Sequence, residues 1–364
     1  MPWQLDEKDI RVWKDHTKKT LISGVDAVNE VRDKYGAEMG TRAWLKMYEM
    51  IAAFDLIDCQ VVQGGECNSL HLCEAPGAFI CATNHYIRTR WPNMRWNWMG
   101  CTLNPYFEGG DTDAMVEDDA FINDTRGNWY FGKDNSGDMR LPVNIEGTWE
   151  RARAMGPVHL VTADGSIDCS GTPNQQEEVV AQLHFCEAVG AMGALAKGGA
   201  FVLKMFTLFE HSSICLLYIL KCFFETVTVN KPIMSTPGNG ETYVISKGFK
   251  GISQEHLQQL LEHCGTQWPS REFDGAALSL VSREHIGNSW LASLQEGAAY
   301  FGRLQGSVIT RNLRLFENSF STADGQAVRV ARQLVVGEWT RRFRIMPINP
   351  AHKIVAHSKA IDPR

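Results

Sequence analysis

The stretch "SLHLCEAPGAFICATNHY", residues 69–86, decides the fold class. Its first half is apolar and stops at Glu74, a small Pro-Gly-Ala turn follows, and a helical pattern then begins. Small residues let a ligand approach the backbone, and a helix start offers N–H groups without a partner inside the helix. We expect a strand over 69–74 and a helix over 77–90, with a ligand at the turn. The alternative is a simple tight turn in which Glu74 points to water.

Strands and helices continue to alternate along the chain. Further strands are expected at 96–103, 157–164, 198–206, 226–230 and 241–246, and helices at 175–196 and 211–224. Near-continuous apolar strands that alternate with helices indicate an α/β fold with a mostly parallel sheet covered by helices on both faces. Ligands of such sheets bind beyond the carboxyl ends of the strands.

The composition is that of a globular protein. The chain has 364 residues, of which 44% are hydrophobic and 21% are charged. Its first residues lack the apolar segment of a secretory signal, and its longest apolar run, 214–220, is short for a bilayer, so we expect no membrane partner. Ten cysteines without a C-x-x-C pair disfavour a zinc ribbon or redox motif and suggest free thiols in a reducing compartment.

Charge is distributed unevenly. The net charge is −6, which by itself disfavours a nucleic-acid partner, but residues 301–364 carry 11 Lys and Arg against four Asp and Glu. This asymmetry is compatible with a local basic surface or with ordinary surface helices. We expect an N-terminal helical extension (1–60), an α/β core (61–250) and a basic, mainly helical C-terminal extension (251–364).

Three charged residues lie where a sheet would bind its ligand. Asp164 closes the apolar strand of "VTADGS", Glu241 begins the last strand, and Lys204 lies inside "FVLKMF". A lysine among apolar residues is unfavourable unless it is paired or reaches a cavity. We expect burial to lower the Lys204 pKa, as a general base requires, although a structural ion pair explains each residue taken alone.

Together with Lys46 in "RAWLKMYEM", these residues resemble, in order and context, the Lys-Asp-Lys-Glu tetrad of FtsJ-like RNA ribose 2′-O-methyltransferases. From the helix pattern alone, Lys46 is a solvated surface lysine. The ordered motifs "CEAPGAFI", "TLNPY", "VHLVTADGS" and "FVLKMFTLFEH" further resemble family members that act on the mRNA cap. The resemblance implies a Rossmann-like class I methyltransferase with a seven-stranded sheet, S-adenosylmethionine as methyl donor, and methylation of the second transcribed nucleotide, which converts cap 1 to cap 2.

The resemblance also implies roles for single residues. Lys204 would be the general base, Asp164 would hold Lys204 and face the donor, and Glu241 would orient Lys46 or Lys204. The donor would be bound by a set of residues around the strand ends: Glu74, Pro76, Gly77, Ala78, Phe79, Trp96, Thr102, Asn104, Asp138 and Asp164. The chain departs from the family at Cys73 and Ala78, where glycine is usual, and at His71, where an acid is usual.

The implied partner is the 5′ end of capped mRNA or small nuclear RNA, and the implied location is the nucleus, the cytoplasm or both. Candidates for phosphate contacts are Arg88, Arg90, Arg95 and the arginines between 311 and 344. Trp129 or Tyr130 would stack on a base or on the cap guanine, unless they pack in the core.

Other interpretations stay open at the level of sequence. The chain could methylate the first transcribed nucleotide or another RNA, or it could be a catalytically silent RNA-binding module. A nicotinamide-dependent dehydrogenase is disfavoured because the G-x-G-x-x-G pattern is incomplete. The acidic segment 106–124 lacks regular ligand spacing, so we expect a solvated loop and no metal.

Overall fold

The computed structural model describes residues 7–110, 114–169, 175–266, 280–318 and 320–355. They form a seven-stranded sheet in the order β3-β2-β1-β4-β5-β7-β6. The strands are β1 (Glu66–Leu72), β2 (Arg95–Cys101), β3 (Trp129–Tyr130), β4 (Val158–Ala163), β5 (Leu195–Met205), β6 (Phe224–Asn230) and β7 (Thr242–Phe249). Neighbours pair in parallel except that β7 runs antiparallel to β5 and β6, which confirms the predicted mostly parallel α/β sheet.

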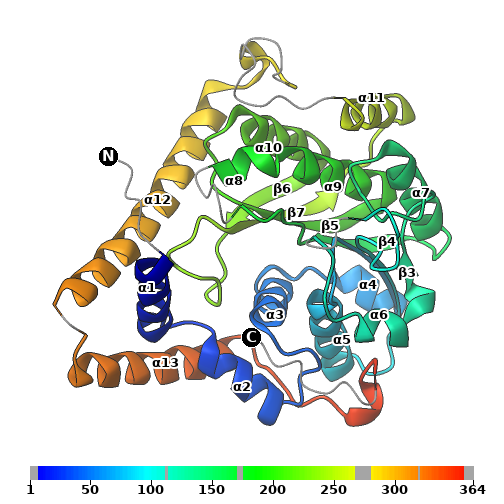
Figure 1. Cartoon of the computed structure of the whole chain (residues 1–364). Helices are drawn as coiled ribbons and strands as arrows, with labels where there is room; N and C mark the ends of the chain where they lie inside the picture. Colours follow the sequence, from blue (N-terminus) through cyan, green and yellow to red (C-terminus); the bar gives the residue numbers. More distant parts are fainter. Residues whose placement is uncertain (1–6, 111–113, 170–174, 267–279, 319, 356–364) are drawn as a thin grey trace.

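Helices cover both faces of the sheet (Figure 1). One face packs on α7 (Pro142–Arg153), α9 (Ala181–Ala194), α10 (His211–Phe223) and α11 (Gln254–Cys264). The other packs on α2 (Val25–Asp33), α3 (Arg42–Phe54) and α5 (Ala78–Arg90), with α4 (Cys59–Gly64) and α6 (Ala120–Asp124) near its margin. Because side chains alternate along a strand, Val202 belongs to the α3 face while Phe201 and Leu203 belong to the α9 face.

The predicted helix over 175–196 is two helices. α8 (Gln176–Val179) ends before α9 begins, and Val180 between them is buried. The carboxylate of Glu177 in α8 accepts the backbone N–H groups of Phe209 and Glu210, just before α10. This contact fixes α8 to the entrance of α10.

The N-terminal and C-terminal helices meet outside the sheet. Figure 1 shows α12 (Asn288–Glu317) and α13 (Thr322–Arg342) on two sides of α1 (Glu7–Thr20), with α2 at the end of α13. Trp339 of α13 is fully buried with Tyr48 of α3, so the C-terminal helices complete the core on that face. The three predicted parts of the chain therefore pack as neighbours.

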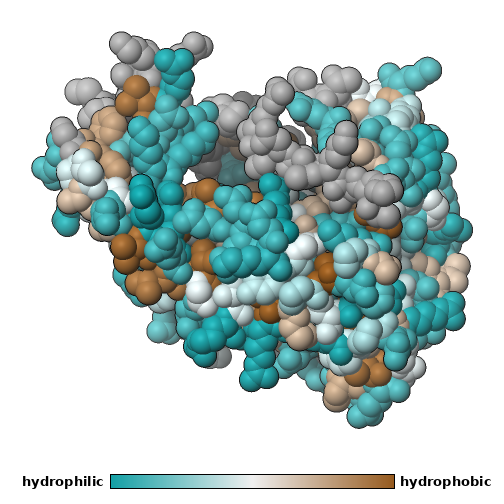
Figure 2. Space-filling model, turned by 90° about the horizontal axis from the view of Figure 1, so that it is seen from below, coloured by the Kyte–Doolittle hydropathy of each residue, from teal (hydrophilic) through white to brown (hydrophobic). Residues whose placement is uncertain are grey.

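The surface seen in Figure 2 is mainly hydrophilic, with hydrophobic side chains in separate small groups. Within the described ranges, no helix combines the length and the apolarity needed to cross a bilayer.

Candidate active site at the carboxyl edge of the sheet

The site begins with the register of two strands. Lys204 of β5 lies opposite Tyr243 of β7, and both side chains face α3 because they alternate with residues of the α9 face. Asp164 directly follows β4, the other neighbour of β5. Lys46 lies on α3, which packs against the same face of the sheet.

These elements bring the four predicted residues into one cluster. Lys46 Nζ lies 2.7 Å from Glu241 Oε1. Lys204 Nζ donates to the Asp164 main-chain carbonyl at 2.7 Å and lies 3.4 Å from its Oδ1. The hydroxyl of Tyr243 joins the two pairs, because it donates to Asp164 Oδ1 at 2.9 Å and accepts from Lys46 Nζ at 3.4 Å.

The electrostatics of the cluster correct the expectation for Lys204. Its burial acts to lower the pKa of the amine, but the neighbouring carboxylates of Asp164 and Glu241 outweigh that effect, and the pKa lies above its ordinary value. Burial likewise acts to raise the pKa of Glu241, and Lys46 outweighs it, so that pKa is lowered. Without bound ligands, both groups are therefore held in their charged forms.

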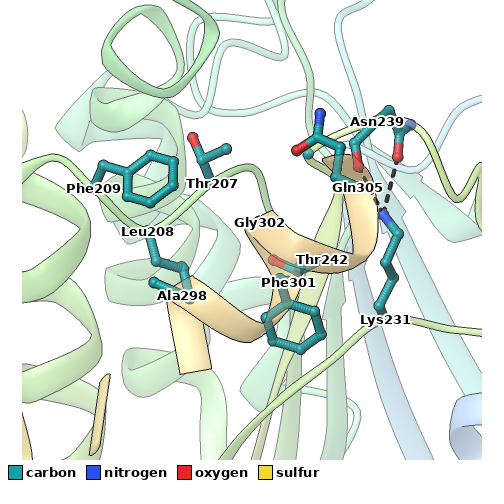
Figure 3. Close-up of a pocket in the computed structure, with 11 residues that line it drawn as sticks. Thr207, Leu208, Phe209, Lys231, Asn239, Thr242, Ala298, Phe301, Gly302 and Gln305 are labelled. Atoms are coloured by element: carbon teal, nitrogen blue, oxygen red, sulfur yellow. Dashed lines mark hydrogen bonds between the residues drawn. The ribbon is translucent and has the colours of Figure 1, made fainter. Parts of the chain in front are cut away.

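The segment between β6 and β7 supports Glu241. Ser235 Oγ donates to Glu241 Oε1 at 2.9 Å. Lys231 Nζ donates to the main-chain carbonyl and the side chain of Asn239 (Figure 3). It also donates to the main-chain carbonyl of Glu241. Burial lowers the pKa of Lys231 to about 8. These bonds close 231–241 into a compact loop that presents Glu241 to Lys46.

The cavity drawn in Figure 3 lies beside this loop. It is lined by Thr207 and Phe209 after β5, by Thr242, and by Phe301 and Gln305 of α12. Its volume of about 20 Å³ is enough for a single water molecule and far too small for a nucleotide. The cavity is therefore a packing gap at the contact between α12 and the loop.

The β1–α5 turn differs from the expectation in one respect. Oε1 of the buried Glu74 accepts the N–H groups of Phe79 at 2.7 Å and of Ile80 at 3.2 Å. Glu74 therefore neither points to water nor leaves these helix N–H groups free for a ligand. The chain supplies its own carboxylate to cap α5.

The remaining residues predicted to bind the methyl donor follow the ends of two strands, β2 and β1. Thr102 and Asn104 directly follow β2, and Asn104 pairs with Asn135 and Ser136 of the loop after β3. Pro76, Gly77, Ala78 and Phe79 form the turn after β1 and the start of α5, and Gly77 has a φ of 120°, which favours glycine. These residues lie at the carboxyl edge with Asp164.

Trp96 is placed differently, and Asp138 lies near the edge but is held by a neighbouring arginine. Trp96 lies near the start of β2, and its Nε1 donates to Ser69 Oγ inside the core. The structure therefore puts Trp96 toward the opposite end of the strand from the site. Asp138, in the loop before α7, is held by Arg140 through its guanidinium and its backbone N–H.

The charges at this edge fit a cationic ligand. Glu74 and Glu187 are buried beside Asp164 and Lys204, and each has one carboxylate oxygen for which the described residues provide no hydrogen-bond partner in good geometry. Burial raises the pKa of Glu187 to about 8, against the effects of the Cys73 thiol and Lys204. Burial also raises the pKa of Glu74 well above its ordinary value, so in the ligand-free chain both carboxyl groups favour their neutral forms near pH 7. A ligand with a sulfonium and an ammonium group, as S-adenosylmethionine has, would favour their ionised forms and add them to the charge of Asp164.

Many candidate RNA contacts already have partners within the fold. Arg88 donates to main-chain carbonyls near its own helix, Arg90 to Tyr48 and Phe343, Arg311 to Thr20, and Arg332 to Lys18, Lys19 and Leu21. Trp129 is buried, and its indole N–H donates to Thr125. Of the two residues predicted to stack on a base or on the cap guanine, Trp129 therefore packs in the core.

The acidic segment 106–124 is described only in part. The described residues contain no group of three or more His, Cys, Asp or Glu that could hold a metal. Asp111 and Asp113 of that segment lie outside the described residues.

Several functional candidates were missed from the sequence. Tyr243 resembles any aromatic residue of a buried strand, and Ser235 resembles any loop serine. Glu187 was easier to detect from the sequence than Tyr243 or Ser235. It is an acid within the apolar run 183–194, and, like Lys204, a buried charged residue needs a partner. Glu49 in the equally apolar α3 gave the same signal.

Comparison with known proteins agrees with this geometry. The FtsJ-like methyltransferase family matches residues 39–249, which include α3 and all seven strands. The cap-specific mRNA (nucleoside-2'-O-)-methyltransferase 2 of Mus musculus is 39% identical over 97% of this chain and 45% of its own length. The proteins of the same name from Danio rerio and Drosophila melanogaster are 41% and 35% identical over 94% and 98% of this chain, and over 45% and 51% of their own lengths.

Among solved structures, a putative ribosomal RNA methyltransferase from Plasmodium falciparum aligns with a TM-score of 0.39 at 18% identity, over 58% of this chain and 99% of its own. The chain spans about half the length of the curated relatives it matches. The family match covers more than half of this chain, and the chain belongs to the FtsJ-like methyltransferase family.

Proposed function

We propose that the chain transfers a methyl group from S-adenosylmethionine to a ribose 2′-hydroxyl at the capped end of mRNA, on the second transcribed nucleotide. The observation that carries this proposal is the Lys46–Glu241–Tyr243–Asp164–Lys204 cluster at the carboxyl edge of the sheet. The names of the relatives support the cap as substrate. Such a substrate implies work in the nucleus, the cytoplasm or both.

The reaction needs a base and an electrostatic environment for a developing oxyanion. A ribose hydroxyl is a poor nucleophile at neutral pH because its pKa is far above 7, so its proton must leave as the bond to carbon forms. When bound, S-adenosylmethionine supplies an activated methyl group on a cationic sulfur. The residues of this chain must then hold the hydroxyl in line with that methyl and accept its proton.

Lys204 is the group that we propose accepts the proton. Its amine is almost buried and is hydrogen-bonded to the Asp164 main-chain carbonyl, which fixes its position at the strand edge. Asp164 and Glu241 favour the ammonium form, whereas a cationic ligand beside Lys204 favours the neutral amine. Ligand binding would therefore move Lys204 toward the form that accepts a proton.

Lys46 provides a second positive charge at the same place. Glu241 holds its ammonium at 2.7 Å, and the hydroxyl of Tyr243 lies 3.4 Å from it. An ammonium fixed beside the acceptor oxygen stabilises the negative charge that develops there. Holding both substrates in this geometry replaces much of the entropy loss of a two-molecule reaction.

The test is methyl transfer from labelled S-adenosylmethionine to synthetic RNAs with a cap 0, a cap 1 or no cap, followed by mapping of the labelled nucleotide. We expect cap 1 RNA to be the best acceptor and the label to lie on the 2′-oxygen of the second nucleotide. Label on the first nucleotide would favour the related activity, and uncapped RNA as best acceptor would remove the cap from the proposal. RNA binding without transfer to any RNA would identify a silent binding module.

A further inference from the structure

The loop 231–241 is held by α3 on both sides of Lys46. Before Lys46 on the helix, Arg42 donates to Thr236 Oγ1 at 2.8 Å and to the Met234 carbonyl at 3.4 Å. One turn after Lys46, Glu49 Oε1 accepts the N–H of Ile233 at 2.8 Å. The helix that carries one member of the Lys46–Glu241 pair therefore also holds the loop that carries the other.

Glu49 makes a second contact, with the C-terminal helices. Its Oε2 accepts the indole N–H of Trp339 at 2.9 Å. Glu49 is 4% exposed and Trp339 is 0% exposed, so both groups are buried at the point where α3, the loop and α13 meet. A buried carboxylate with one partner on each element holds all three in a single arrangement.

We propose that Glu49 is a positioning residue for methyl transfer, through which α13 fixes the loop that presents Glu241 to Lys46. This inference rests on the proposed function for its catalytic consequence. Its structural part, the fixing of the loop by Glu49 and Trp339, is independent of the substrate.

The route from Glu49 to the reaction is short. Ile233, which Glu49 holds, lies two residues before Ser235, and Ser235 Oγ donates to the Glu241 carboxylate at 2.9 Å. Glu241 in turn holds Lys46. Freeing the loop therefore misplaces the Lys46 ammonium, and a misplacement of about 1 Å can lower a rate by ~10²-fold.

Titration of Glu49 gives the inference a pH signature. Burial raises the pKa of Glu49 to about 7, against the N–H donors of Ile233, Trp339 and Met234 and the positive charge of Arg342 on α13. The other charged groups on these elements are Arg42 and Lys46 of α3, Lys231 and Glu241 of the loop, and Asp324, Arg329, Arg332, Glu338 and Arg341 of α13. Protonation at lower pH turns a charged acceptor into a weaker neutral one, so the loop is held less firmly below about pH 7.

Glu38 provides a matched control. It is also a buried acid with a raised pKa, and it also holds the C-terminal part of the chain, through the N–H groups of Ile354 at 2.9 Å and Val355 at 2.6 Å. It makes no hydrogen bond to the described residues of the 231–241 loop. Glu38→Gln therefore repeats the loss of a buried carboxylate without releasing Glu241.

The experiment compares Glu49→Gln, Trp339→Phe and Glu38→Gln in the full chain by hydrogen exchange and by steady-state kinetics on cap 1 RNA. We expect faster exchange of residues 231–241 in the first two variants and not in Glu38→Gln. Their kcat should fall ~10–100-fold at pH 8, with the Kd for S-adenosylmethionine within about twofold of the wild type. Trp339→Phe keeps most of the ring packing and removes the donor, so it tests the contact even where Glu49→Gln folds poorly.

The pH profile separates positioning from a general structural role. In the wild type, the acid-side fall of kcat should contain a component with a midpoint near 7 in addition to the titration of Lys204, and in Glu49→Gln this component should be absent because the side chain cannot ionise. Unchanged exchange of 231–241 in both Glu49 and Trp339 variants would overturn the inference even if methyl transfer is confirmed. Altered exchange in a wild type that transfers no methyl would instead overturn the proposed function.

Discussion

The edge of the sheet and the C-terminal helices both carry several charged residues, but they use them differently. At the edge, Lys46 and Lys204 are nearly buried and their ammonium groups meet carboxylates. On the C-terminal helices, Arg311 and Arg332 direct guanidinium groups to main-chain carbonyls of α1 and the segment after it. The first arrangement brings charged groups of opposite sign together, whereas the second joins the C-terminal helices to α1.

The comparison teaches which charges are informative in a sequence. A lysine inside an apolar strand is unfavourable without a partner, so its presence alone points to a specific cluster. An arginine on a long helix can donate its hydrogen bonds to many different partners. The number of arginines in a segment therefore gives only its net charge and does not show which of them are free to bind a ligand. The basic balance of residues 301–364 therefore overstated the surface available to RNA.

The largest effect is expected for Lys204→Ala. Removing the proton acceptor should lower the single-turnover rate of methyl transfer ~10³-fold, because general bases contribute about that much. The Kd for S-adenosylmethionine, measured by calorimetry, should change little. Donor binding lost together with activity would mean that Lys204 supports the pocket rather than the reaction.

The pH dependence of the wild type gives the next effect. The pKa of Lys204 lies above its ordinary value in the ligand-free chain. While the pH is below that pKa, each increase of one pH unit therefore raises the neutral fraction of Lys204 about tenfold. The value of kcat/KM for the donor should rise ~100-fold between pH 7.5 and 9.5, a range above the Glu49 titration. A plateau in this range would contradict the raised pKa.

Tyr243→Phe tests the bridge between the two amine–acid pairs. The variant keeps the ring and removes a hydroxyl that contacts Asp164 and Lys46. We expect kcat to fall about tenfold, since loss of one hydrogen bond to a charged group corresponds to ~1.5–3 kcal/mol. Equal rates for the variant and the wild type would show that the pairs act independently.

A pair of arginine variants tests the other region. Arg332→Ala should lower the free energy of unfolding by about 2 kcal/mol, because three main-chain carbonyls lose a charged donor, and should leave RNA affinity nearly unchanged. Arg329→Ala, one helical turn away and exposed, should change stability by less than ~0.5 kcal/mol. Urea unfolding and RNA titrations at several salt concentrations measure both, and a larger RNA effect from Arg332 would reverse the comparison.

Most of the sheet could be predicted because its strands are apolar runs bounded by turns. β3 could not, since two residues, Trp129 and Tyr130, carry no periodicity. The tetrad was accessible through Lys204 and through the family resemblance, which also explains why Lys46 was found despite its surface-like pattern. Trp96 was misplaced because proximity in sequence to Thr102 says nothing about which end of a strand a residue occupies.

The details of the site depended on contacts between distant segments. The turn after β1 indicated that Glu74 is special, but its capping of α5 required the fold of that turn. The sign of the Lys204 pKa shift depended on how closely Asp164 and Glu241 approach, because burial and attraction act in opposite directions. Loop closure around Glu241 by Glu49, Arg42 and α12 is likewise a property of tertiary packing.

We propose that one buried cluster of two amines and two acids directs the transfer of a methyl group onto a ribose hydroxyl. The most direct measurement is single-turnover transfer of labelled methyl to cap 1 RNA by the wild type and by Lys204→Ala, with the labelled position mapped in each product. We expect label on the 2′-oxygen of the second nucleotide with the wild type and almost none with the variant. Label on a base, or equal transfer by both proteins, would contradict this proposal.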